Sequence, residues 1–401
     1  MPRKTPQDAL PDPIKEITLP SGKKRYRFVI DVGRKPDGGR RQLTITRKTI
    51  TEARTEYGRL LSAKESGTLI VPNKITVGQW IDQWLKLKEE DVEVTTLNSY
   101  VTTLKPAKKQ LGHIRLQQLT EEDVVAWRDW LLTEGRVRPR NGRKGLSTTT
   151  ADMALGRLKE VLNRAVTKRL VALNVAQHVS ISSKARRADR RARPKVKPWN
   201  TEEVRAFIAG AATHRLFAAF LLSLMGLRPA EVCGLRWSDI DFETRVLVVD
   251  NTRTMINNNE TIEKDTKSES SDRDLPLPTL LFDALKRFRA LQAAQKLALG
   301  QDYEESGYVV VDEIGQPLTV RLLRVETKKV MGALGMRLVR LYDARASCLT
   351  FLANQGVPRH ILARWAGHSN PKTTEQFYIK PDVEDLRAAA EVWGGLDGGT
   401  S

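Results

Sequence analysis

The chain has 401 residues, of which 40% are hydrophobic and 29% are charged, a composition typical of soluble globular domains, and its length favours two or three domains. No apolar run reaches the roughly 18–20 residues of a membrane-spanning helix, and the first ten residues lack the apolar segment of a secretion signal, so we expect a cytoplasmic protein with no membrane partner. Two cysteines are too few for a disulfide scaffold or a cysteine-built zinc site.

The formal net charge of +19 is unevenly distributed along the chain. Residues 1–74 carry 17 basic and 8 acidic side chains, residues 75–182 carry 17 and 12, and residues 183–197 carry 8 and 1. Residues 198–401 carry 25 and 27 and are nearly neutral. A basic N-terminal half joined to a nearly neutral C-terminal half favours a nucleic-acid-binding part attached to a separate functional domain.

Residues 24–47 alternate with the period of a β-strand. Tyr26, Phe28, Ile30 and Val32 share one face, and the turn residues at 35–39 separate them from a second alternating run. A helix should follow the capping residue Thr49. This small sheet with one helix carries basic side chains that could enter a DNA groove or simply face solvent: Arg25, Arg27, Arg40 and Arg41.

Residues 75–178 predict a compact bundle of about four helices. Trp80, Trp84 and Trp127 recur at helical spacing with aliphatic residues, which favours core packing over base stacking. Between two of the predicted helices lies a basic loop that is suited to phosphate contacts, with Arg138, Arg140, Arg143 and Lys144.

Residues 183–197 have almost no apolar content and predict a basic interdomain linker. Its arginines could follow a DNA backbone, or the segment could be a passive connection; they include Arg186, Arg187, Arg190 and Arg191.

Residues 198–401 predict a mainly α-helical domain with a small antiparallel sheet, whose strands fall near 245–250, 261–263 and 273–277. The chain as a whole is therefore expected to be multidomain: a small sheet with a helix, an all-α bundle, and this mixed domain.

Three motifs occur in order in the last domain. The first is Gly226-Leu-Arg-Pro-Ala-Glu-Val232, the second is Tyr342-Asp-Ala-Arg345, and the third is Gly367-His-Ser369, which is followed by a tyrosine at 378. Ten positions separate His368 from Tyr378, and 23 separate Arg345 from His368. Together the motifs resemble the tyrosine recombinase (phage integrase) family, which reads G-L-R-x-x-E, H-x-x-R and L-G-H-x before a tyrosine.

The resemblance implies a catalytic role for each matching residue. Arg228 and Arg345 would clamp the scissile phosphate, for which permanently charged planar guanidinium groups are suited, and His368 would donate to the same phosphate. Tyr378 would be the nucleophile; because a phenol has an unperturbed pKa near 10, it needs positive neighbours. Glu231 would orient Arg228.

The family's general acid is a lysine on a β-hairpin, before a strand that ends in proline. Here the corresponding segment runs from 263 to 276, and counting back from Pro276 favours Lys267 over its rival Lys264.

Tyr342 departs from the family pattern, because it stands where a histidine is usual. A phenol can still donate a hydrogen bond to phosphate, but near pH 7 it is a poorer base than imidazole. Tyr342 is therefore included among the candidate catalytic residues, with its proton-transfer role open.

The resemblance also implies the organisation. Residues 1–66 look like the arm-type DNA-binding domain of lambda-type integrases, 75–182 like their core-binding domain, 183–197 would link them to the catalytic domain at 198–401. The expected reaction integrates and excises a phage or mobile element through a 3′-phosphotyrosyl intermediate, with no metal or cofactor. The expected partners are double-stranded core-type and arm-type sites, a homotetramer on DNA, an excisionase-like directionality factor and a host DNA-bending protein, in a bacterial cytoplasm.

Three alternatives are kept open. An Xer-like dimer-resolving recombinase or a type IB topoisomerase would use the same chemistry, although the resolving relatives lack the extra basic N-terminal domain. A non-catalytic DNA-binding protein on a decayed recombinase fold is the third, and only Tyr342 favours it.

Overall fold

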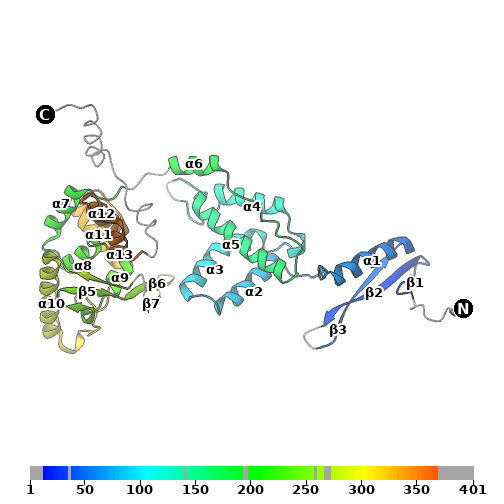
Figure 1. Ribbon diagram of the computed structural model, residues 1–401, viewed down its shortest axis with the longest axis horizontal. Helices are drawn as coiled ribbons and strands as arrows, with labels where there is room; N and C mark the ends of the chain where they lie inside the picture. The colour runs from blue at the N-terminus through cyan, green and yellow to red at the C-terminus, as the bar shows by residue number, and fades with distance from the viewer. Residues whose placement is uncertain are drawn as a thin grey trace, which may run out of the picture. The chain divides into compact units, whose positions relative to one another are not determined.

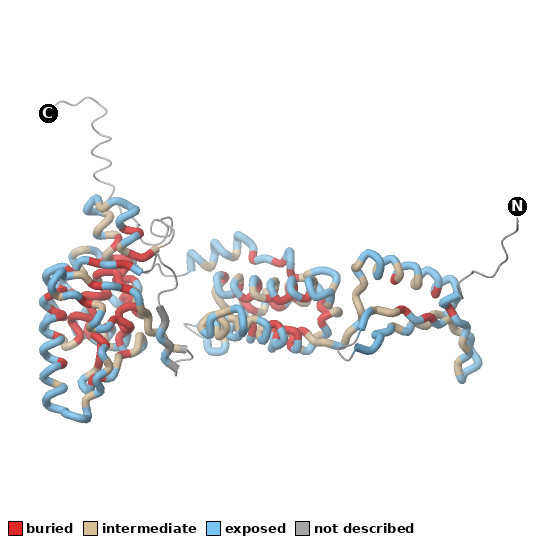
Figure 2. The backbone as a smooth tube through the Cα atoms, turned by 60° about the horizontal axis from the view of Figure 1, so that its bottom comes forward, coloured by how far each residue is buried: buried red, intermediate tan, exposed pale blue. Residues whose placement is uncertain are grey.

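The computed structural model describes residues 12–34, 38–139, 142–192, 197–256, 260–265 and 272–368. The chain divides into two compact units, Met1–Pro194 and Lys195–Ser401 (Figure 1). Buried backbone gathers inside each part of the chain, so each has its own hydrophobic core (Figure 2). In the residues that the structure describes, no helix combines the length and apolarity that crossing a membrane requires.

The first unit begins with a three-stranded antiparallel sheet and one helix. The strands are β1 (Lys15–Thr18), β2 (Lys24–Arg34) and β3 (Arg40–Arg47), in the order β1-β2-β3, and the helix is α1 (Ile50–Glu65). Phe28 and Ile30 are buried against α1, as the alternation predicts, and the Thr49 side chain caps the helix by accepting from the Glu52 amide. Sequence analysis missed β1.

Four helices form the bundle that follows. They are α2 (Val77–Glu89), α3 (Val94–Leu111), α4 (Glu121–Thr133) and α5 (Thr148–Thr167), with a 3₁₀ turn, η2, at Leu116–Gln118. Trp80, Trp84 and Trp127 are buried in the bundle core, and the Trp80 indole donates to the Val161 carbonyl at 2.9 Å. The prediction that these tryptophans belong to the core is confirmed, because rings buried in this way cannot stack on bases.

Within the expected linker, residues 183–191 form helix α6 (Ser183–Arg191) on the bundle. The Asp189 carboxylate accepts from the backbone and hydroxyl of Thr148 at 2.9 and 2.8 Å, at the start of α5. Arg186 pairs with Asp152 at 3.0 Å. These polar contacts dock a helix that has no buried residue of its own, which a search for apolar faces cannot detect.

In its described residues the second unit is mainly helical, with two small antiparallel sheets. Its helices are α7 (Thr201–Ala211), α8 (Phe217–Leu224), α9 (Pro229–Gly234), α10 (Thr279–Leu299), α11 (Val320–Ala333), α12 (Leu341–Asn354) and α13 (Arg359–Ala366), with 3₁₀ turns η3 (Trp237–Asp239) and η4 (Gly300–Asp302). The strands β4 (Ile240–Asp241), β5 (Val246–Val249) and β8 (Arg273–Pro276) form one sheet, and β6 (Asn251–Ile256) and β7 (Glu260–Asp265) form a separate hairpin.

The predicted fold class is confirmed, but a single sheet was expected here. The chain continues almost directly from apolar β5 into the more polar β6, but β5 pairs with β4 and β8 whereas β6 pairs with β7.

Candidate active site

Arg228 lies at the break between α8 and α9, as the first motif predicts. Gly226 has φ of 105°, a conformation that favours glycine, and Pro229 occupies the first turn of α9. The Arg228 side chain is 30% exposed. Its Nη1 donates to Glu231 at 2.5 Å, and its Nη2 donates to the Gly367 carbonyl at 2.8 Å.

Glu231 lies beneath Arg228 and is 1% exposed. Its carboxylate also accepts from the Arg228 backbone amide at 2.7 Å and from Arg273 on β8, whose Nη2 and Nη1 lie 2.9 and 3.3 Å away. Burial opposes the carboxylate charge, but the hydrogen bonds and charges of Arg273 and Arg228 together lower the Glu231 pKa. Glu231 is therefore ionised and holds both arginines.

Arg345 is fully buried on α12. Its side chain contacts both the Gly226 turn before α9 and the end of α13. Its Nη1 donates to the Gly226 carbonyl at 2.6 Å, and its Nη2 donates to the Ala366 carbonyl. The same Nη2 lies 2.9 Å from His368 Nε2. The second and third motifs, 23 residues apart, thus meet at the first.

Three arginines converge on consecutive carbonyls at the end of α13. Arg273 Nε donates to Trp365 at 2.8 Å, Arg345 donates to Ala366, and Arg228 donates to Gly367. The last carbonyls of a helix lack partners within the helix, so cationic donors from other elements fit there. Gly367 ends α13 in the left-handed conformation, at φ of 62°.

The site carries excess positive charge. Burial, followed by the charges of Arg345, Arg228 and Arg273, lowers the pKa of His368 to about 4, so this ring is neutral at pH 7. The three guanidinium groups and the Glu231 carboxylate then give the five side chains a net charge of +2. A cluster of this kind suits an anion with several oxygen acceptors.

Tyr342 lies one turn before Arg345 on α12 but is 42% exposed. The next residue, Asp343, is buried. Its carboxylate accepts two hydrogen bonds from the Arg340 side chain, at 2.7 and 3.0 Å. The structure therefore places Tyr342 at the surface, on the helix that carries Arg345.

Two predicted catalytic residues, Lys267 and Tyr378, lie outside the described residues, and the Lys264 side chain is likewise not described. The hairpin that leads to Lys267 is fixed to the domain through Glu263 on β7. That carboxylate accepts from the Tyr308 hydroxyl, and it pairs with Arg236 at 2.8 Å.

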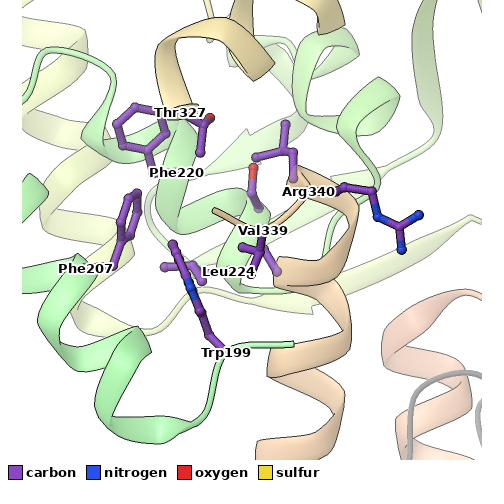
Figure 3. A pocket seen from close by; sticks show the side chains of 10 residues that line it. Trp199, Phe207, Phe220, Leu224, Thr327, Val339 and Arg340 are labelled. Atoms are coloured by element: carbon purple, nitrogen blue, oxygen red, sulfur yellow. The ribbon is translucent and has the colours of Figure 1, made fainter. Parts of the chain in front are cut away.

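A small pocket in the same unit has different chemistry. It is lined by Trp199, Phe207 and Phe220 together with other mainly apolar side chains, and the Arg340 guanidinium points away from it (Figure 3). Its two hydroxyl groups, of Ser223 and Thr327, donate to carbonyls of their own helices. Arg228, Glu231, Arg273, Arg345 and His368 do not line it, so it is separate from the candidate active site.

The basic residues of the N-terminal sheet do not share one face. Strand alternation puts Arg25 and Arg27 on the face opposite to buried Phe28, and Arg27 donates to the Thr46 hydroxyl at 3.4 Å. Arg40 and Arg41 are exposed neighbours on β3, so their side chains leave on opposite sides.

The basic loop of the bundle and α6 lie together. Arg143 donates to the Ala192 carbonyl at 2.9 Å, and Arg138 and Lys144 are exposed. On α6 the exposed basic side chains are those of Lys184, Arg186, Arg187, Arg190 and Arg191. Arg140 lies outside the described residues.

Sequence analysis assigned no role to Arg273. It stands in the segment that was searched for the general acid, three residues before Pro276 and between two aspartates, Asp272 and Asp274. Its pairing with Glu231 depends on a separation of 42 residues, which no local pattern reveals.

Comparisons with known proteins agree with this geometry. Residues 200–385 match the phage integrase family, and residues 76–181 match the SAM-like domain of phage integrases. A XerC-like tyrosine recombinase of Caldanaerobacter subterraneus is 27% identical over 94% of this chain and 97% of its own length. An integrase of Streptomyces ambofaciens is 26% identical over 93% of this chain and 94% of its own length.

Solved structures share the fold. The integrase of transposon Tn1549, in complex with a circular intermediate DNA, aligns over 80% of this chain and 99% of its own, with 19% identity and a TM-score of 0.62. A lambda integrase dimer bound to a core site aligns over 95% of this chain and all of its own, with 17% identity and a TM-score of 0.52.

Proposed function

This chain is a site-specific tyrosine recombinase of the phage integrase family, and from that premise we propose which of its residues cut and rejoin DNA. One observation carries the proposal: Arg228, Arg345 and His368, from three separate motifs, converge at the end of α13 in a cluster of net positive charge. That cluster is the binding site for the scissile phosphate, whose non-bridging oxygens gain negative charge in the transition state.

The cleavage step balances as a transesterification. Tyr378 gives up its phenolic proton to water, its oxygen attacks the phosphorus, and the bond to the 5′-oxygen breaks. That oxygen takes its proton from Lys267, or from Lys264 as the rival. The products are a 3′-phosphotyrosyl link and a free 5′-hydroxyl. A 5′-hydroxyl from the partner duplex then attacks the link and releases Tyr378, so the number of phosphodiester bonds is conserved.

The basic parts of the first unit support a role in holding duplex DNA. Supporting side chains are those of Arg25 and Arg27 on the face of the sheet away from Phe28, Arg143 and Lys144 on the bundle loop, and the exposed cationic side chains of helix α6. We infer that they bind arm-type and core-type sites, in a homotetramer in the bacterial cytoplasm, with a directionality factor and a DNA-bending protein as partners. The biological task is integration and excision of a phage or mobile element.

The test is a suicide substrate: core-site DNA with a nick next to the cleavage position, so that the short 5′-hydroxyl fragment diffuses away. The wild-type protein should accumulate a covalent protein–DNA adduct, and Tyr378→Phe should bind the same DNA and form none. An adduct in Tyr378→Phe would contradict the nucleophile assignment. No adduct with the wild-type protein would instead favour the decayed recombinase.

A further inference from the structure

Arg273 is the most buried charged side chain at the site besides Arg345, and the reaction proposed above does not use it. Its side chain has 0% exposure, against 30% for Arg228. Burial does not set Arg273 apart from Arg345, which is equally enclosed. Arg273 differs in its partners, because it contacts both the Glu231 carboxylate on α9 and the Trp365 carbonyl on α13.

Arg228 has to serve two partners. In this structure its Nη2 donates to the Gly367 carbonyl and its Nη1 donates to Glu231. When a phosphate enters, Arg228 can turn toward it only if other groups hold Glu231 and the end of α13. Arg273 contacts both of them from β8 and remains buried.

Tight packing at Gly367 couples Arg273 to the turn that carries His368. A Cβ atom built at Gly367 would lie 2.8 Å from Arg273 Nη1 and 3.3 Å from its Cζ. The backbone of this turn thus lies directly against the Arg273 guanidinium. A shift of Arg273 would move the turn and, with it, His368.

We propose that Arg273 is a positioning residue for strand cleavage: it joins Glu231 to the end of α13, and so holds Arg228 and His368 in place for the scissile phosphate. Without Arg273, the buried Glu231 carboxylate has Arg228 as its remaining arginine partner among these contacts, and it would draw that guanidinium away from the phosphate. The cluster would also lose one positive charge. The inference rests on the proposed function, since its readout is cleavage.

The experiment compares single-turnover cleavage of the nicked core-site DNA by the full-length wild type, Arg273→Met, Glu231→Gln and the double variant, at saturating protein. We expect Arg273→Met to slow cleavage about 100-fold, the loss typical of a small misplacement of catalytic groups, with the DNA dissociation constant changed less than about 3-fold. We expect the double variant to cleave at least about 10-fold faster than additive losses predict, because it leaves no buried carboxylate without its partner.

Arg215→Met is the matched control. Arg215 lies in the same unit, its side chain is 17% exposed, and it donates to the carbonyls of Val311 and Asp312. Its loss should lower the melting temperature and leave the cleavage rate within about 3-fold of wild type. An equal rate loss in Arg215→Met, additive losses in the double variant, or a wild-type rate in Arg273→Met would each overturn the inference.

Arg273→Lys gives a second route if Arg273→Met does not fold. It keeps the charge but loses the planar fork that spans two partners, so it should fold and still cleave at least about 10-fold more slowly than wild type. Cleavage by Arg273→Lys at the wild-type rate would contradict the proposal. Absence of an adduct with the wild-type protein is a different result, which removes the proposed function itself.

Discussion

The Arg345 guanidinium lies 2.9 Å from Nε2 of His368 and fixes the state of that ring. A guanidinium can only donate, so Nε2 accepts and the proton of the neutral ring is on Nδ1. The motif that supplies Arg345, the proposed phosphate ligand, therefore also sets the tautomer of His368, 23 positions later in the chain.

Acidification should destabilise the second unit through His368. Its pKa is lowered to about 4 in the folded protein, whereas an unfolded histidine has a pKa near 6.5. Between these values the unfolded chain binds more protons, so stability rises with pH and is lost as the pH falls from about 6.5 toward 4, by at most about 1.4 kcal/mol per pH unit.

Urea unfolding of wild type and His368→Gln at several pH values between 4.5 and 7.5 measures this effect. The free energy of unfolding should fall more steeply with acid in the wild type, and the difference between the proteins isolates His368 from the carboxylates that they share. Parallel pH profiles would show that His368 does not titrate at the lowered pKa.

Replacement of Arg345 by lysine should abolish most of the cleavage activity. One ammonium group cannot replace a fork that donates to Gly226 and Ala366 while it contacts His368. We expect single-turnover cleavage to slow by about 10²- to 10³-fold, the usual effect of removing a preorganised donor to a transition-state oxyanion. Arg340→Lys, an exposed change at the start of the same helix, is the control and should stay within about 3-fold; equal losses would contradict a specific role for Arg345.

The two candidate general acids can be separated by the leaving group. A 5′-sulfur leaving group needs no protonation, because a thiol has a pKa near 8.5. Substitution of the true general acid by alanine should slow cleavage of ordinary DNA by about 10²- to 10⁴-fold and leave cleavage of the sulfur substrate nearly unchanged. We expect this pattern for Lys267→Ala, with Lys264→Ala as the comparison; rescue of Lys264→Ala alone would reverse the assignment.

Tyr342 provides a test of the departure from the family motif. If its hydroxyl donates to the phosphate from its exposed place on α12, Tyr342→Phe should slow cleavage by about 10-fold, the value of one hydrogen bond to a charged group. Tyr342→His should retain activity and add a dependence on pH near 6.5. The cleavage rate of the three proteins, measured as a function of pH, tests both effects. A Tyr342→Phe profile identical to that of the wild type would remove Tyr342 from the active site.

Docking of α6 through Asp189 should matter for DNA binding. Asp189→Ala removes the contacts to Thr148, so we expect α6 to detach and the affinity for core-site DNA to fall, although the protein becomes more positive. Asp129→Ala is the matched control, because it makes the same charge change on α4 and removes only the pair with Arg128. It should bind slightly more tightly, in line with charge alone. Fluorescence anisotropy at two salt concentrations measures both, and tighter binding by Asp189→Ala would refute the role of docking.

The sequence by itself determined the local structure and the order of the motifs. Alternation placed Phe28 and Ile30 on the buried face of the sheet, helical spacing placed Trp80 and Trp84 in the bundle core, and the capping role of Thr49 followed from its side chain. These features depend on residues within a few positions of each other, so they can be read along the chain. The family motifs likewise singled out Arg228, Arg345 and His368 as candidates for one site.

Tertiary structure alone decided how those residues meet. The three arginines reach consecutive carbonyls at the end of α13 from β8, from the residue before α9 and from α12, and the Arg273–Glu231 pair spans 42 positions. The docking of α6 through Asp189 has the same origin. These are polar contacts between distant segments, whose partners are set by how the helices and strands pack, and an apolar pattern carries no information about them.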